Sequence, residues 1–298
     1  DTENPACSVE SVPVSVNDRT RFIYEAACCG LRDFFVKNGY KKACVGVSGG
    51  IDSAVVACLA VAALGAENVR GLMMPSQFSS EGSVEDAKQL AENLGIEFHV
   101  VPITEAYRSI VDTLIPVIGG TDFDATEENI QSRIRTLMLM ALQNKNGYIL
   151  LNCSNKSENA LGLCTLYGDT GGAFSVTGDL YKTEMYDLAR YINRKFGAPI
   201  PENILTKEPS SELRPNQKDS DMLPSYEVVD AILYRLIEDG QSREEIINAG
   251  FDSDEVQKIY AMVMRNEKKR FQYPPVLRLS SSSFGHEYRM PLTHKYVK

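Results

Sequence analysis

Val45-Gly46-Val47-Ser48-Gly49-Gly50-Ile51-Asp52-Ser53 determines the fold of this chain, because two adjacent glycines separate an apolar segment from one rich in alanine and valine. Residues 43–47 form a short apolar run, which predicts a buried strand. Residues 52–64 predict a helix that ends at Gly65, since glycine commonly follows the last turn of a helix. The stretch therefore predicts a strand, a glycine-rich turn and a helix in direct succession.

The same alternation continues on both sides of this stretch. Further strands are predicted at 69–74, 96–101 and 148–151, and further helices at 18–38, 81–94, 104–115 and 127–144, with Asp18 as the N-cap of the first. Strands separated by helices of this length imply right-handed crossovers and a parallel sheet covered on both faces. The sequence therefore predicts an α/β fold with a Rossmann-like, doubly wound parallel sheet.

The two ends of the chain have different patterns. Residues 1–17 contain few large apolar side chains and two prolines, so we expect an arm or linker, with 18–298 as one domain. Beyond Gly178 the predicted elements are mainly helical, at 180–195, 225–238, 242–249 and 252–270. Between them, the proline-containing segment 206–224 predicts a long mobile loop, and loops of this length in a domain are often functional.

Composition narrows the class of protein. The formal net charge of −9 argues against general nucleic-acid binding, because nucleic-acid backbones require a basic surface. No apolar run approaches the roughly 18–20 residues of a membrane span, and no secretory leader begins the sequence, so we expect a cytoplasmic protein with no membrane partner. Seven cysteines without a Cys-x-x-Cys pair indicate small buried side chains rather than disulfides or a zinc ribbon. The sequence begins on Asp1, which suggests part of a longer protein.

The glycine-rich turn has the properties of a phosphate-binding loop. Ligands of a doubly wound sheet bind at the carboxyl ends of the strands, where this loop lies. Gly49 and Gly50 allow close approach of the backbone, and the N–H groups that begin the next helix face an anion. Ser48 and Ser53 add hydroxyl donors. Asp52 would repel phosphates unless a cation lay between them, which suggests that Mg²⁺ bridges Asp52 to the phosphates.

Two glycines alone would fit a turn without any ligand, so the assignment as a phosphate-binding loop depends on the whole motif. The dinucleotide-binding pattern G-x-G-x-x-G and the phosphate loop G-x-x-x-x-G-K-[ST] are both missing from this sequence. Ser-Gly-Gly-x-Asp-Ser after an apolar strand instead resembles the pyrophosphate loop of the N-type ATP pyrophosphatases. Those enzymes cleave ATP between its α and β phosphates and leave an adenylylated substrate. The loop leaves NAD synthetase, GMP synthetase, asparagine synthetase and the tRNA thiolases open.

Motifs further along the chain resemble those of NAD synthetase, in sequence and in order. They are 152–158 (NCSNKSE), 165–169 (TLYGD) with 171–172 (GG), 178–184 (GDLYKTE), 207–219 (KEPSSELRPNQKD) and 266–270 (NEKKR) followed by 274–275 (PP). The segment 207–219 is similar to the mobile loop of the glutamine-dependent members. The resemblance extends from residue 18 to the end of the chain.

This resemblance implies a ligase that converts nicotinic acid adenine dinucleotide (deamido-NAD) to NAD. ATP would adenylylate the pyridine carboxylate and release pyrophosphate, and ammonia would then displace AMP. The resemblance also implies an adenine nucleotide alpha hydrolase-like fold, Mg²⁺ as cofactor and a homodimer with the substrate near its interface. Glutamine-dependent members carry an amino-terminal glutaminase domain, for which residues before 18 leave no room. We therefore expect a synthetase domain of a longer protein, or an enzyme that uses free ammonia.

The resemblance also assigns roles to individual residues. Asp52 and Lys182 are the expected catalytic residues, and Asp52 and Glu158 are the expected Mg²⁺ ligands. The residues expected to contact ATP are Gly46, Ser48, Gly49, Gly50, Asp52, Ser53, Cys153, Lys182 and Ser210. Those expected to contact deamido-NAD are Asn129, Arg133, Glu158, Lys268 and Lys269. The family more often has threonine where this chain has Cys153, and a thiol is a weaker hydrogen-bonding group, so we expect lower ATP affinity at most.

Each of these residues also has an ordinary structural explanation. Lys182 by itself would be a solvated lysine on a helix face, and Glu158 could complement a helix dipole. Only the ordered set favours the ligase. A tRNA thiolase would carry a basic RNA surface and functional cysteines, and a non-catalytic nucleotide-binding module would be expected to lack Asp52, Glu158 or Lys182.

Overall fold

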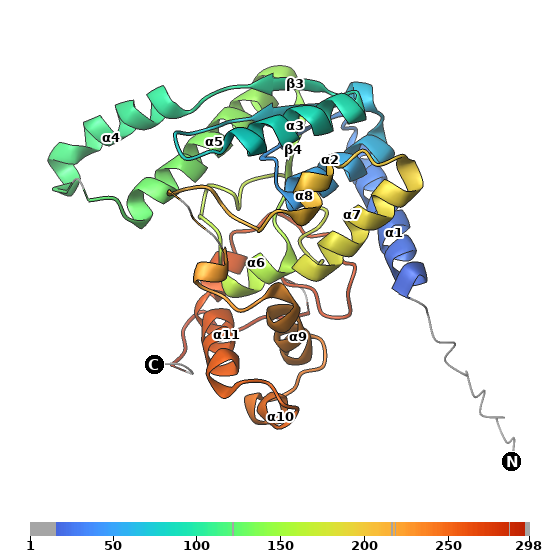
Figure 1. Cartoon of the computed structure of the whole chain (residues 1–298), viewed down its shortest axis with the longest axis vertical. Helices are drawn as coiled ribbons and strands as arrows, with labels where there is room; N and C mark the ends of the chain where they lie inside the picture. The colour runs from blue at the N-terminus through green and yellow to red at the C-terminus, as the bar shows by residue number, and fades with distance from the viewer. Residues whose placement is uncertain (1–15, 121, 216, 218, 286, 296–298) are drawn as a thin grey trace, which may run out of the picture.

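Five parallel strands form one sheet in the order β3-β2-β1-β4-β5. Figure 1 labels β3 and β4 among the helices that surround the sheet. The strands are β1 (Lys42–Gly46), β2 (Val69–Met73), β3 (Glu97–Val100), β4 (Tyr148–Asn152) and β5 (Phe174–Ser175). This computed structural model describes residues 16–295 except 121, 216, 218 and 286, so most of the predicted arm and two residues of the 206–224 loop lie outside the described residues. The strand order reverses its direction between β1 and β4, which confirms the predicted doubly wound sheet.

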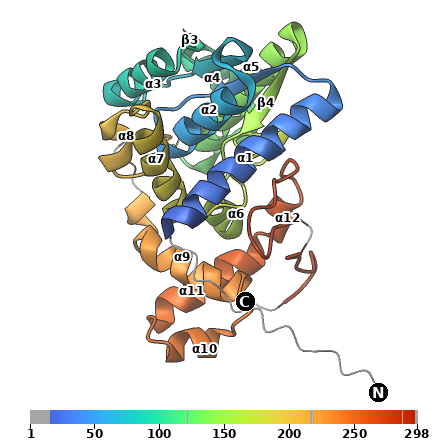
Figure 2. The same ribbon diagram turned by 90° about the vertical axis from the view of Figure 1, so that its right-hand side faces the viewer.

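Alternate residues of β1 point to opposite faces of the sheet, and each face has its own helices. Ala43 and Val45 belong to a core shared with α1 (Val16–Asn38), α2 (Ile51–Leu64), α3 (Glu81–Leu94) and α7 (Lys182–Phe196). Cys44 belongs to a second core shared with α4 (Thr104–Ile118) and α5 (Ala125–Asn146). Figure 2 shows α1 crossing the face that α2 covers. Both faces of the sheet are therefore buried, as a parallel sheet requires.

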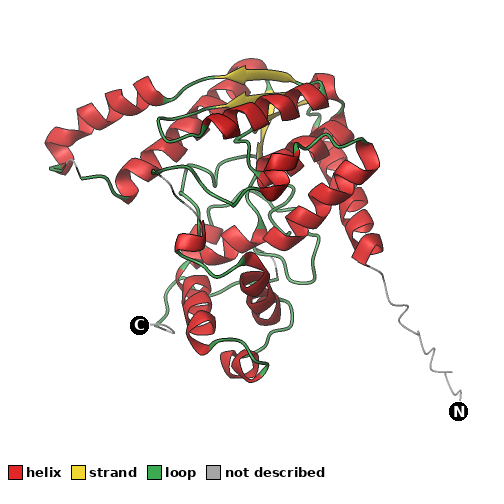
Figure 3. Cartoon of the chain, in the orientation of Figure 1, coloured by secondary structure: helices red, strands yellow, loops and turns green. Residues whose placement is uncertain are grey.

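A third apolar core holds the helical carboxyl-terminal region together. It contains residues of α6 (Lys156–Leu161), α9 (Tyr226–Ile237), α10 (Arg243–Asn248) and α11 (Ser253–Arg265), with α12 (Glu267–Arg270) beside them. The short helix α8 (Glu202–Thr206) follows α7, and single 3₁₀ turns occupy 66–68 and 219–221. Loops lie between the sheet and this helical region (Figure 3).

Several element boundaries and burial predictions were wrong, each for a local reason. Helix α1 begins at Val16, so Asp18 lies inside its first turn and is not the N-cap. Helix α4 continues past Pro116, which removes only one helical hydrogen bond near an exposed end. The predicted helix 252–270 is interrupted at Asn266, whose side chain donates to the carbonyl oxygen of Met262 at 2.7 Å. Cys29 lies on the exposed side of α1, although buried cysteines were expected.

Three short elements lie outside the predicted ranges, α6, α8 and β5, with six, five and two residues. In the part of the chain that the structure describes, no helix has both the length and the apolar character that a membrane crossing requires.

Candidate active site

A cavity of about 320 Å³ opens where β1, β2 and β4 end. This position is the switch point of the sheet, and the volume suits a small-molecule site. The predicted site residues that line the cavity are Gly46, Ser48, Gly50, Asp52, Ser53, Cys153, Glu158, Lys182 and Ser210. The structure thus brings together residues separated by as many as 164 positions in the sequence, from Gly46 to Ser210.

The glycine-rich loop between β1 and α2 is held by its own two serines. The Ser53 hydroxyl accepts a bond from the Ser48 N–H at 3.1 Å and donates to the Gly50 carbonyl oxygen at 3.1 Å. The two serine hydroxyls are 3.1 Å apart, and the Ser48 hydroxyl accepts from the Gly50 N–H at 3.2 Å. Helix α2 begins at Ile51, so its first N–H groups are presented at the cavity, as an anion requires.

Gly49 does not line the cavity but lets the loop pass close to α3. Its φ is +80°, and an added Cβ would lie 2.2 Å from the carbonyl oxygen of Ser83. Both the backbone conformation and the space therefore require glycine.

Replacing Gly49 with alanine is expected to lower the free energy of unfolding by at least about 2 kcal/mol, because left-handed strain and a backbone clash add together. Gly39→Ala is the matched control, since Gly39 has a φ of +74° but no atom within 4 Å of an added Cβ. That variant should lose only about 1 kcal/mol. Urea denaturation of both variants measures the difference, and equal losses would exclude the clash at Ser83.

The charged centre of the cavity is the Lys182 ammonium, which joins two carboxylates. Its Nζ lies 2.6 Å from Asp52 Oδ2 and 3.4 Å from Glu158 Oε1. Asp52 Oδ1 accepts a further bond from the side chain of Asn155 at 2.9 Å, so both carboxylate oxygens are engaged. The ring of Tyr226 lies 5.4 Å from the same ammonium. Residues from α2, α6, α7 and α9 therefore converge on one cation.

Lys182 is almost completely buried, at 3% exposed, and yet remains charged. Burial alone would lower the pKa of its ammonium, but the charges of Asp52 and Glu158 outweigh burial and hold that pKa well above its usual value. Asn155 caps α6 and Glu158 completes the capping box, so the start of this helix fixes both side chains locally.

The same geometry bears on the predicted metal ion. In the described residues, no group of three or more His, Cys, Asp or Glu side chains could hold a metal. Asp52 and Glu158 nevertheless converge on one point and are oxygen donors of the kind Mg²⁺ uses, since Mg²⁺ often takes one or two carboxylates together with phosphates and waters. The sequence suggested that Asp52 needs a nearby cation, and in the structure the Lys182 ammonium is such a cation.

Cys153 lines the cavity as a neutral thiol. Its Sγ lies 4.0 Å from the carbonyl oxygen of Gly46 and 3.9 Å from that of Leu151. Burial, followed by the charge of Asp52, raises the pKa of the thiol far above its usual value. The side chain is therefore a weak hydrogen-bond donor and not a nucleophile.

The 206–224 loop covers the cavity and is attached to α3. The Glu212 carboxylate accepts bonds from the Ser80 and Ser83 hydroxyls, both at 2.8 Å, at the start of that helix. Lys207 Nζ lies 2.8 Å from Asp86 Oδ2. Ser210 lines the cavity, and its hydroxyl donates to the Gln217 carbonyl oxygen at 2.5 Å. The predicted mobility of this loop stays a prediction.

Most residues predicted to contact deamido-NAD form a second group, around the segment 162–166. Asn129 accepts a bond from the Thr165 hydroxyl at 2.6 Å, and Arg133 donates to the Leu166 carbonyl oxygen at 3.1 Å. Lys269 donates to the carbonyl oxygens of Gly162 and Cys164 at 2.6 and 2.8 Å. None of these three lines the cavity, and Lys268 is exposed outside it.

Asp169 connects the two groups and was not predicted as a site residue. It lines the cavity, and its Oδ1 accepts from the Thr165 N–H at 2.6 Å. Its side chain is accessible to water. Desolvation by the surrounding protein atoms nevertheless raises the pKa of the carboxyl to about 6, against the hydrogen bond from the Thr165 N–H and the positive charge of Lys269. Its place in the Tyr-Gly-Asp motif was the available signal.

Arg135 is a second cavity residue that sequence analysis did not select. It lies two positions after Arg133, so the two side chains leave α5 on different sides, and only Arg135 reaches the cavity. It donates to the Met74 carbonyl oxygen at 2.9 Å, and burial lowers the pKa of its guanidinium to about 10. The group remains charged at neutral pH and adds positive charge to the cavity.

Known proteins share this architecture and sequence. A family model described as NAD synthase matches residues 23–273. Glutamine-dependent NAD(+) synthetase of Aquifex aeolicus (strain VF5) is 52% identical over 276 residues, which cover 93% of this chain and 48% of that protein. The structure of glutamine-dependent NAD+ synthetase from Acinetobacter baumannii in complex with ADP is 41% identical, with a TM-score of 0.63, over 95% of this chain and 51% of that chain.

A shorter relative matches along nearly all of its length. NH3-dependent NAD synthetase from Campylobacter jejuni, in complex with the nitrate ion, is 31% identical with a TM-score of 0.68, over 84% of this chain and 96% of that chain. The chain spans about half the length of the curated relatives it matches. From the match to the family model and the shared fold, the chain belongs to the NAD synthase family.

Proposed function

We propose that the chain catalyses ATP-dependent amidation of deamido-NAD to NAD. A carboxylate oxygen of the substrate attacks the α phosphorus of ATP, and the bond to the β phosphate breaks to release pyrophosphate. The lone pair of ammonia then attacks the carbonyl carbon, the bond to AMP breaks, and the nitrogen loses a proton. The observation that carries the proposal is the buried Lys182 ammonium, joined to Asp52 and Glu158 beside the glycine-rich loop.

The residues around the cavity have distinct roles in this proposal. The N-terminus of α2 and the Ser48 and Ser53 hydroxyls bind the phosphates of ATP. Lys182 stabilises the negative charge that develops on the phosphates as the bond between them breaks. Asn129, Arg133 and Lys269 contact deamido-NAD near the segment 162–166, with Asp169 between them and the cavity. Family membership and the geometry of both groups support these roles.

Magnesium fits the proposal through Asp52 and Glu158, which would hold it together with the phosphates. When bound, the ion supplies positive charge that neutralises the phosphate oxygens. Lys182, which these two carboxylates contact in the structure, then remains available to the leaving pyrophosphate.

The ammonia source is proposed separately. The longer relatives are named glutamine-dependent, and the Campylobacter relative, which this chain nearly covers, is named NH3-dependent. We propose that this chain uses ammonia directly and that a glutaminase domain of the whole protein delivers it. The free cysteines of the described region suit the reducing cytoplasm that we propose for this protein.

A homodimer is proposed from exposed apolar side chains on α4, on α5 and on the loop between them, which we take as one surface. The exposed fractions are 80% for Val117 and 46% for Ile118 of α4, 41% for Phe123 of the loop between the two helices, and 66% for Leu137 of α5. Helix α4 projects away from the rest of the molecule (Figure 1), which leaves this surface open to a second copy. Exposed apolar patches of this kind commonly mark interfaces.

Leu137→Asp is expected to raise the dimer dissociation constant at least about 10-fold, because it places an unpaired charge in the proposed interface. Sedimentation equilibrium measures the change. Val36→Asp, at an exposed site on α1, is the matched control and should leave the dimer intact. A Leu137→Asp protein with the dissociation constant of the control would exclude this surface.

Exchange of labelled pyrophosphate into ATP tests the proposed reaction. Label should enter ATP only when deamido-NAD is present, because the first step is reversible and needs a free carboxylate. NAD is the control substrate, since its carboxylate is already an amide. No exchange with deamido-NAD would refute the proposal, and exchange that required tRNA would favour a thiolase. The acidic net charge already makes the thiolase the weaker candidate.

A further inference from the structure

The N-terminus of α7, which carries Lys182, is capped by side chains from two other helices. Tyr181 precedes the helix and is not one of the Ser, Thr, Asp or Asn residues that usually cap a helix. Instead, the Lys182 N–H donates to the Ser157 hydroxyl of α6 at 2.9 Å. The Thr183 N–H donates to Asp230 Oδ2 of α9 at 2.8 Å. The position at which α7 begins therefore depends on α6 and α9.

Asp230 also sets the direction of the Ser157 hydroxyl. The Ser157 Oγ donates its single proton to Asp230 Oδ1 at 2.5 Å, so a lone pair of the same oxygen faces the Lys182 N–H. Ser157 is 0% and Asp230 5% exposed, so water cannot readily replace either partner. One carboxylate thus orders both hydrogen bonds at the start of α7.

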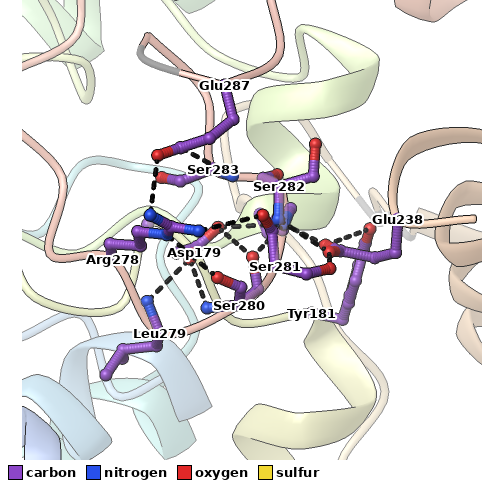
Figure 4. A network of polar contacts seen from close by, with 12 residues as sticks. Asp179, Tyr181, Glu238, Arg278, Leu279, Ser280, Ser281, Ser282, Ser283 and Glu287 are labelled. Carbon is purple, nitrogen blue, oxygen red and sulfur yellow. Dashed lines mark hydrogen bonds and ion pairs between the residues drawn. The ribbon is translucent and has the colours of Figure 1, made fainter. Parts of the chain in front are cut away.

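Helix α9, which carries Asp230, is held in place by contacts between its carboxyl end and the segment 279–282. Glu238 directly follows this helix and accepts bonds from Ser281 and from the Ser282 N–H, the latter at 2.9 Å (Figure 4). Asp179 accepts from the N–H groups of Leu279 and Ser280, both at 2.7 Å. The segment 279–282 therefore fixes both the end of α9 and the approach to α7.

A buried lysine ties α6 into the same network. Lys156 is 0% exposed, directly precedes Ser157 and lies 2.9 Å from Asp179 Oδ1, with Glu238 as its second ionic partner. It also donates to the Ser280 hydroxyl at 2.7 Å. Helices α6, α7 and α9, which meet at Lys182, are thus held in one arrangement. Because α9 is fixed, Asp230 can hold the start of α7 in place.

We propose that Asp230 is a positioning residue for Lys182, acting through Ser157 and the start of α7. The inference rests on the proposed function, in which the Lys182 ammonium stabilises the charge on the leaving pyrophosphate. Tyr226 of the same helix lies 5.4 Å from that ammonium, so α9 borders Lys182 at its side chain as well as at its backbone.

The contribution of Asp230 depends on pH. Burial raises the pKa of this carboxyl to about 6, against the bonds from Ser157 and Thr183. The titratable groups that face it are Glu184 of α7 and Tyr181 just before that helix, while α6 presents the non-ionisable hydroxyl of Ser157. The carboxylate is present above this pKa and is lost as the pH falls through about 6. Protonation then removes an acceptor from Ser157 or Thr183.

Asp230→Asn tests the proposal, because the amide has nearly the shape of the protonated acid. Above neutral pH, kcat for NAD formation with ammonium should fall about 10-fold, with less than about a twofold change in the KM for ATP, since misplacing Lys182 affects the transition state more than ATP binding. The ratio of wild-type to variant kcat should approach one below about pH 6. Taking this ratio cancels titrations that both proteins share, including that of Asp169.

Glu227→Gln neutralises an exposed carboxylate on the same helix and is the matched control, with wild-type kinetics expected. Hydrogen exchange gives a readout independent of catalysis: amides at the start of α7 should exchange about 10-fold faster in Asp230→Asn than in the control. An active wild type with an unchanged Asp230→Asn profile, or unchanged exchange at α7, would overturn the positioning role. An inactive wild type would refute the proposed function instead, and hydrogen exchange would still decide the role of Asp230.

Discussion

Lys182→Met is expected to reduce deamido-NAD-dependent exchange of pyrophosphate into ATP about 100- to 1,000-fold, the usual loss when one electrostatic contact to a transition state is removed. Methionine keeps the length of the side chain but carries no charge. The carboxylates of Asp52 and Glu158, at 2.6 and 3.4 Å from the lysine nitrogen, lose their shared partner, and the leaving pyrophosphate loses the ammonium proposed to stabilise it.

The size of the loss has to be separated from any effect on folding. Lys195→Met makes the same substitution in the last turn of α7, where the side chain is exposed, and should retain wild-type exchange. The KM for ATP in Lys182→Met should change much less than kcat, because the proposed interaction strengthens as the phosphate bond breaks. A Lys182→Met enzyme within about threefold of wild type would show that this lysine does not stabilise the transition state.

Asp52→Asn is expected to reduce the same exchange about 1,000-fold or more while the fold is retained. The Asp52 carboxylate accepts two bonds, from Lys182 and from Asn155, whereas an asparagine side chain has only one oxygen. The variant therefore weakens the contact to Lys182 or the contact to Asn155, which caps α6. It also removes one of the two negative charges that would hold Mg²⁺.

Titration of Mg²⁺ distinguishes the loss of a hydrogen bond to Asp52 from the loss of a metal ligand. If Asp52 is a metal ligand, the concentration of Mg²⁺ that gives half-maximal exchange should rise well above the wild-type value. Asp187→Asn, at a half-buried site on α7, is the matched control and should leave both activity and Mg²⁺ dependence unchanged. A folded Asp52→Asn protein that keeps wild-type activity would remove Asp52 from both the catalytic and the metal site.

The sequence predicted the sheet well because its signals are local. The glycine that follows a helix, as Gly65 and Gly95 do, and the alternation of strands and helices define β1, β2, β3 and β4 within a few residues of their observed bounds. In contrast, β5 has only two residues and exists because Phe174 pairs with Leu151 of β4, and Ser175 also bridges Val276. A strand that depends on such distant partners has no pattern of its own.

The candidate site was predicted in part for a similar reason. Asp52, Glu158 and Lys182 lie in motifs that could be recognised one at a time, and the fold brings them within hydrogen-bond distance. Arg135 could not be separated from Arg133 without knowing which side of α5 faces the cavity. Asp230 and Ser157 act on Lys182 only through contacts between three helices, which no spacing in the sequence indicates.

Transfer of oxygen from substrate to AMP tests the central claim most directly. Deamido-NAD labelled with ¹⁸O in its pyridine carboxylate is incubated with the chain, ATP, Mg²⁺ and ammonium, and the AMP is analysed by mass spectrometry. If the carboxylate is adenylylated, the oxygen that links it to phosphorus leaves with AMP, so each AMP should carry one ¹⁸O for each NAD formed. Unlabelled AMP, or NAD formed without AMP, would contradict the proposed reaction.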